Sequence, residues 1–172
     1  MRKSLFLVVL LLLAMMPIAA QGQITTLVCG SQNATIVGTP GDDTIVVPSD
    51  VPSVVHARGG NDVVYGGDEQ DLICGGRGND VVYGGNEQDS ISGGRGADII
   101  YAGNGSDESL IGGRGNDQLY GGPGEYDVVM SGPGADLLDG GPGWGDTLEF
   151  ADSGPIAVRI RWPRRSRRAS SS

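Results

Sequence analysis

Acidic side chains recur along this 172-residue chain at a spacing of nine or ten residues. Each follows a glycine-rich stretch and precedes a short apolar run. Carboxylates that return with every turn of a coil form a column, in which neighbouring charges repel one another unless a proton or a cation intervenes. The spacing therefore predicts a series of cation sites. The recurring acids are Asp62, Asp71, Asp80, Asp89, Asp98, Asp107, Asp117, Asp127, Asp136 and Asp146.

Calcium is the cation that this pattern favours. It takes about six to eight oxygen ligands and tolerates irregular geometry, whereas magnesium requires a strict octahedron and holds its waters tightly. Glycine-rich loops can turn their carbonyl oxygens toward an ion, because glycine readily adopts positive φ. The candidate loop glycines are Gly75, Gly76, Gly78, Gly93, Gly94, Gly96, Gly112, Gly113 and Gly115.

The elements that carry these acids repeat with a nine-residue period, as in 75–83, 93–101 and 112–120. A glycine pair in nearly every unit excludes a helix, because glycine costs about 1 kcal/mol per helical position. Short strands separated by glycine turns fit the period. The units begin at Ala57, Gly66, Gly75, Gly84, Gly93, Ala102, Gly112, Gly121, Ser131 and Gly140.

A longer period of eighteen residues indicates two repeats per coil. Arg77, Arg95 and Arg114 occupy the same place in alternate repeats, while Glu69 and Glu87 occupy another place in the repeats between. Like loops then stack on like loops at two edges. One edge carries Asp62, Asp80, Asp98, Asp117 and Asp136, and the other carries Asp71, Asp89, Asp107, Asp127 and Asp146.

Residues 57–149 resemble the repeats-in-toxin (RTX), or haemolysin-type, calcium-binding family, and residues 34–45 resemble the opening unit of such arrays. The resemblance implies an all-β fold, a parallel β-roll that forms a right-handed β-solenoid with two repeats per turn. It also implies that the first six residues of each repeat bind calcium between turns. The last three residues would form a strand whose middle side chain points inward.

Charge and composition agree with a metal-dependent fold. The chain carries a net charge of −9, and the repeats alone contain 17 acidic residues and 4 arginines. Aromatic residues make up only 5% of the chain, which is few for an ordinary packed core. Low hydrophobicity with high net charge predicts disorder without calcium, so that metal binding would supply the free energy of folding.

The chain divides into four segments. Arg2 and Lys3 followed by an apolar run and Ala19-Ala20 predict a signal peptide over 1–22, with an uncleaved anchor as the alternative. Residues 23–56 are expected to form an N-terminal cap or first degenerate repeat, 57–150 the calcium-binding roll, and 151–172 a closing strand with a basic tail. The protein is thus expected to be secreted, with no membrane span after cleavage.

Cys29 and Cys74 are the only cysteines, and an exported protein permits a disulfide between them. Such a bond would hold the N-terminal cap on the roll. Two unpaired thiols are the alternative.

Catalytic constellations are absent from the sequence, which predicts a non-enzymatic protein. His56 is the sole histidine and Lys3 the sole lysine, and the glycine-rich segments lack the strand–helix context of a nucleotide site. The alternatives are an adhesion or matrix module that contacts an anionic cell surface or polysaccharide, and an accessory domain of a secreted hydrolase or epimerase system. Arg164–Arg168 could serve surface contact or belong to a solvated tail, and no nucleic-acid partner is expected.

Overall fold

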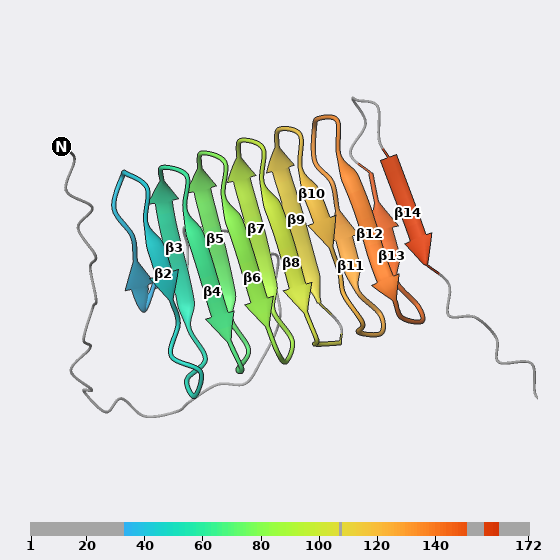
Figure 1. Ribbon diagram of the computed structural model, residues 1–172, viewed down its shortest axis with the longest axis horizontal. Helices are drawn as coiled ribbons and strands as arrows, with labels where there is room; N and C mark the ends of the chain where they lie inside the picture. Colours follow the sequence, from blue (N-terminus) through green and yellow to red (C-terminus); the bar gives the residue numbers. More distant parts are fainter. Residues whose placement is uncertain (1–32, 107, 151–156, 162–172) are drawn as a thin grey trace, which may run out of the picture.

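Two parallel sheets of seven strands each, stacked face to face, make up the fold (Figure 1). A computed structural model of the chain describes residues 33–106 and 108–150, together with the backbone of 157–161. Every helix or strand found in these ranges is a β-strand. The fold is thus all-β and parallel.

The strands alternate between the two sheets along the chain. The odd sheet has the order β1-β3-β5-β7-β9-β11-β13, and the even sheet β14-β12-β10-β8-β6-β4-β2. The odd strands are β1 Ile36–Val37, β3 Val54–Gly59, β5 Leu72–Arg77, β7 Ser90–Arg95, β9 Ser109–Arg114, β11 Val128–Met130 and β13 Thr147–Glu149. The even strands are β2 Thr44–Val46, β4 Val63–Gly67, β6 Val81–Gly85, β8 Ile99–Gly103, β10 Gln118–Tyr120, β12 Leu137–Pro142 and β14 Ala157–Arg161.

This alternation confirms the predicted β-roll with two repeats per turn. Each strand pairs in parallel with the strand one full turn away, so that Val64 lies opposite Val82, and Val82 opposite Ile100. Because equivalent residues of successive turns are in register, the side chains of one repeat position form a straight column along the roll.

The core consists of two apolar columns, one from each sheet. Branched side chains suit a pleated surface that packs on one face, and the inward position of each repeat carries Val, Ile or Leu. From β3 to β12 these side chains are fully buried. They are Val55, Val64, Ile73, Val82, Ile91, Ile100, Leu110, Leu119, Val129 and Leu138.

Glycine is required where the loops of successive turns touch. Gly94 has a φ of +116°, and a Cβ added there would collide with the carbonyl oxygen of Gly76 in the preceding turn. A side chain would therefore meet both backbone strain and a steric clash. The close approach of the turns depends on this absence of side chains.

Four tyrosines form a ladder on the outer face of the even sheet. Tyr65, Tyr83, Tyr101 and Tyr120 stack in sequence, with ring centroids 5.1, 5.1 and 4.9 Å apart. The ladder follows directly from the register of β4, β6, β8 and β10. The ladder begins at Tyr65 on β4 and ends at Tyr120 on β10.

The roll extends on both sides of the repeats. Strands β1 and β2 pair with β3 and β4, so that the degenerate unit before Ala57 is part of the first turn, and β14 continues the even sheet beyond β12. The predicted signal peptide over 1–22 and the basic tail from Arg164 lie outside the described residues. Across the part that is described, there is no helix long and apolar enough to cross a bilayer.

Candidate metal centre

The first acidic column follows one edge of the roll, at the loops that precede the even strands. Within it, the Oδ1 atom of each aspartate accepts a hydrogen bond from the backbone N–H of the equivalent aspartate one turn earlier. The four donor–acceptor distances in this series are 2.9 Å. We call this series the Asp98 column, and its members are Asp62, Asp80, Asp98, Asp117 and Asp136.

The second acidic column, at the loops before the odd strands, is built in the same way. Asp89 Oδ1 accepts from Asp71 N–H at 2.9 Å, and Asp146 Oδ1 accepts from Asp127 N–H at 3.2 Å. Between them the register is held by Glu108, whose Oε2 accepts from Asp89 N–H at 2.7 Å. The members of this Asp89 column are Asp71, Asp89, Glu108, Asp127 and Asp146.

Glu108 thus holds the place that the sequence pattern assigned to Asp107, which itself lies outside the described residues. This loop contains one extra residue. Counting forward from the start of the repeat therefore does not decide which of the two acids takes the place of the aspartate that recurs in the other repeats. The distance to the core decides between them, because Glu108 precedes the buried Leu110 by two residues, as Asp89 precedes Ile91. That spacing was the available signal for Glu108.

Substitution of the two acids in this loop is expected to give unequal effects. Glu108→Gln removes a buried charge that points into the column, so it should raise the calcium concentration needed for half-saturation, by at least about tenfold if Glu108 is a ligand. Asp107→Asn removes the same charge from the neighbouring position and serves as the matched control. Calcium titration followed by circular dichroism measures both, and a larger shift for Asp107→Asn would contradict the assignment.

In eight of these carboxylates the second oxygen is buried from solvent. It accepts no hydrogen bond from any residue that the structure describes. A buried polar atom without a partner is costly, and an array of them points to a missing cation. The atoms are the Oδ2 of Asp62, Asp71, Asp80, Asp89, Asp98, Asp117 and Asp136, and the Oε1 of Glu108.

Backbone carbonyls converge on the same places. A Cβ added to Gly75 would lie 2.5 Å from Asp80 Oδ2 and 2.7 Å from the carbonyl oxygen of Gly93, one turn further on. The missing side chain thus leaves a space that is bordered by a carboxylate oxygen and a carbonyl oxygen. The space repeats at Gly112, where a Cβ would lie 2.6 Å from Asp117 Oδ2 and 2.5 Å from the carbonyl oxygen of Ser131.

Burial raises the pKa of eight column carboxylates, although the backbone N–H donors act in the opposite direction. These are Asp62, Asp71, Asp80, Asp89, Asp98, Asp117, Asp146 and Glu108. The pKa rises to about 7 for Asp89 and Asp98, and to about 8 for Glu108. The negative charges of Asp117 and Asp80 raise the pKa of Asp98 further. At a pH above these values the ionised columns need a positive charge that the described side chains do not supply.

Acid is expected to favour the roll in calcium-free protein. A carboxylate whose pKa is raised from 3.8 to about 6 or 7 on folding, as in Asp62 and Asp98, stabilises the fold fully below the unfolded value. That stabilisation is lost as the pH rises through the folded value. Circular dichroism of dialysed, calcium-free protein should thus show β-structure growing as the pH falls from above 7 to about 5.

The same titration in saturating calcium should show the smaller dependence on pH, because the cation already balances the charge of the columns. Calcium-free protein that instead lost structure steadily on acidification would contradict the sign of this linkage.

The donor set favours calcium over metals that need several side-chain ligands. In the described ranges, no three His, Cys, Asp or Glu side chains come together as a metal cluster. The gaps beside Gly75 and Gly112 each offer a carboxylate oxygen and a backbone carbonyl oxygen from the next turn. A hard cation that accepts carbonyl oxygens and irregular geometry fits this set, as calcium does.

The pattern of acids continues upstream to Asp43, which was not among the calcium ligands predicted from the repeats. Asp43 N–H donates to Asp62 Oδ1 at 2.8 Å, so it heads the Asp98 column. Its own Oδ2 accepts from Thr39 N–H, in contrast to the unpartnered oxygens of the later turns. Its position two residues before the buried Ile45 was the signal that could have identified it.

Cys74, the one cysteine among the described residues, is disulfide-bonded. The only other cysteine of the chain is Cys29, which lies outside the described residues. Cys74 belongs to β5 and is nearly buried on the outer side of the odd sheet.

Comparison with protein families gives one match. A model of the RTX calcium-binding nonapeptide repeat (4 copies) matches residues 30–46, 54–82, 75–108, 103–125 and 126–144. These segments include Asp43 and every member of the two acidic columns except Asp146. No curated protein and no solved structure matches the chain.

Proposed function

Because the chain belongs to the RTX calcium-binding nonapeptide repeat family, which binds multiple Ca²⁺ ions, we propose that it is a secreted, non-enzymatic calcium-binding protein that folds on binding. The observation that carries this proposal is the row of buried carboxylate oxygens without partners along both edges of the roll. Calcium between turns would give these oxygens a counter-charge and join each turn to the next.

The residues proposed to hold the ions are the members of the two columns together with glycines of the loops. In the gap beside Gly75, Asp80 Oδ2 and the carbonyl oxygen of Gly93 border the space. One turn further on, Asp98 Oδ2 borders the space beside Gly93 in the same way. The oxygens of the chain bind the ion, while the N–H···Oδ1 ladder fixes the carboxylate orientation. A bound calcium ion would contribute positive charge and no other chemistry.

Equilibrium dialysis against radioactive calcium tests the binding directly. We expect several ions per chain at millimolar calcium, with cooperative binding because each carboxylate borders gaps on both sides. Magnesium at the same concentration should displace little calcium, because it keeps its waters. A protein that binds no calcium in this range would overturn the proposal.

Export is proposed from the segment over 1–22, and extracellular calcium at millimolar levels suits modules with weak individual sites. The disulfide of Cys74 supports an oxidising compartment. N-terminal sequencing of the protein recovered from the medium should find a start near residues 20–22. A full-length chain retained in the cell would contradict export.

A further inference from the structure

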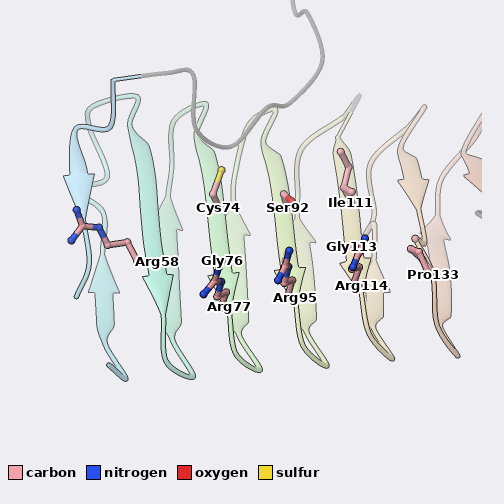
Figure 2. A pocket seen from close by; sticks show the side chains of 13 residues that line it. Arg58, Cys74, Gly76, Arg77, Ser92, Arg95, Ile111, Gly113, Arg114 and Pro133 are labelled. Atoms are coloured by element: carbon pink, nitrogen blue, oxygen red, sulfur yellow. The ribbon is translucent and has the colours of Figure 1, made fainter. Parts of the chain in front are cut away.

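A groove of about 670 Å³ runs along the outer side of the odd sheet, across β5, β7 and β9 (Figure 2). Its floor is bare backbone at the second glycine of successive repeats, where a side chain would strike the preceding turn. The close stacking of the loops therefore creates the groove as a direct consequence of the fold. The floor glycines are Gly76, Gly94, Gly113 and Gly132.

Three exposed arginines form one wall of this groove. Arg77 lies opposite Arg95, and Arg95 opposite Arg114, in the register of β5, β7 and β9. Figure 2 shows their guanidinium groups in a single row, with Ser92 and Ile111 on the other side of the glycine floor. We call these three residues the arginine row. The row ends at Pro133, the equivalent residue of the next turn.

No residue that the structure describes neutralises the positive charge of the arginine row. Among the described residues, none of the three guanidinium groups has an ion-pair or hydrogen-bond partner, although the chain as a whole carries a net charge of −9. The nearby column carboxylates point to the metal gaps, where calcium would balance them. A row of unpaired arginines therefore offers an anion-binding surface on an acidic protein.

The geometry of the row selects a linear partner. Neighbouring strands lie about 4.8 Å apart, and the row runs along the stacking axis of the roll, so charges on a partner should recur at a similar interval. An extended chain of uronic acids carries one carboxylate per sugar ring, so a segment of several rings can offer carboxylates along the whole row. Guanidinium groups bind carboxylates through two parallel hydrogen bonds.

A single-stranded nucleic acid fits the same surface less well. Such strands are held by aromatic side chains on which the bases stack, alongside the basic groove. The residues that line this groove include no aromatic side chain, and the stacked tyrosines lie on the outer face of the other sheet.

From the register, the open glycine floor and the unpaired charge, we propose that the groove between Arg77 and Arg114 binds an acidic polysaccharide of the uronic acid class. This inference rests on the calcium binding proposed above, because the groove exists only in the folded roll. It goes beyond calcium binding in assigning a partner to a surface that the metal sites do not use.

The test measures binding of fluorescently labelled hexagalacturonate by anisotropy, in calcium sufficient to saturate the roll. The wild-type protein should bind this probe, and a neutral, fully methyl-esterified hexamer should bind far less. The triple variant Arg77→Gln, Arg95→Gln, Arg114→Gln should lose about tenfold or more in affinity. The corresponding Arg→Lys triple variant keeps the charge but not the planar guanidinium group. Its affinity for the probe should lie between that of the wild type and that of the Gln variant.

A charge-matched control replaces Arg164, Arg165 and Arg168 of the basic tail by Gln, and it should bind the probe like the wild-type protein. Circular dichroism and calcium titration of every variant establish that the roll is folded, which separates failure of the groove from failure of calcium binding. If the triple variant did not fold, Arg95→Gln alone would serve, with a smaller loss.

Several results would overturn the proposal. The first two are that the folded wild-type protein does not bind hexagalacturonate, or that the folded Arg77, Arg95 and Arg114 triple Gln variant binds it as well as the wild type does. The others are that the neutral hexamer binds equally well, or that only the tail variant loses affinity. Tighter binding of oligothymidylate than of hexagalacturonate would assign the groove to nucleic acid instead.

Discussion

Calcium-free protein at neutral pH is expected to give the far-UV circular dichroism spectrum of a disordered chain, and millimolar calcium is expected to convert it to a β-spectrum. Folding without the metal would bury two columns of ionised carboxylates, and most of their second oxygens have no hydrogen-bond partner among the described residues. An unbalanced buried charge costs several kcal/mol, whereas a whole domain is stable by only about 5–15 kcal/mol. A few such charges therefore suffice to unfold the roll.

The control for this experiment is magnesium at the same concentration, which should restore little β-structure because it keeps its hydration waters. An increase in ionic strength alone should also leave the chain disordered, since screening acts weakly on buried charges. Identical spectra with and without calcium would contradict the coupling of metal binding to folding.

The second large effect is expected for Asp98→Asn, and its sign should depend on calcium. The amide keeps an oxygen that can accept the hydrogen bond from Asp80 N–H, which Oδ1 of Asp98 accepts at 2.9 Å. It removes the charge on Oδ2, which has no partner in the protein. In calcium the variant should need at least about tenfold more metal to fold, because the sites on both sides lose a charged ligand.

Without calcium the same substitution should stabilise the roll. Burial and the neighbouring Asp117 and Asp80 raise the pKa of Asp98 to about 7, so its charge opposes folding at higher pH. Removing the charge is worth on the order of a few kcal/mol. Urea denaturation of both proteins in calcium-free buffer at about pH 5 and about pH 6, where the acidic roll is expected to persist, would measure this as a reduced pH dependence.

Asp50→Asn is the matched control, since Asp50 is exposed and belongs to neither column. It should leave both the calcium midpoint and the calcium-free stability close to wild type. Should Asp98→Asn weaken the fold equally in both conditions, the carboxylate would be structural and not a metal ligand.

Much of this architecture could be predicted from the repeats. The nine-residue period separated strands from turns, and the recurrence of Arg77, Arg95 and Arg114 indicated two strands per turn. The structure confirms this, because odd and even strands form separate sheets. The prediction works because a parallel solenoid places equivalent residues in register, so sequence period and spatial neighbour are directly related.

The identity of the acid in an irregular loop could not be predicted in the same way. Spacing from the glycines favoured Asp107, while the hydrogen bonds place Glu108 in the column. An inserted residue makes the count from the glycines ambiguous. The count back from the apolar Leu110 favours Glu108, and the pairing of β9 with its neighbours shows that Leu110 is the inward residue of this repeat.

The sequence by itself determined the repeat, the two edges of carboxylates and the choice of calcium, because these depend on residue type and period alone. Only the tertiary structure decided which oxygen of each carboxylate is satisfied and which is left without a partner. It also decided that Arg77, Arg95 and Arg114 border an open groove. Both depend on the distance between stacked turns, where backbone N–H groups hold one oxygen and glycine leaves room beside the other.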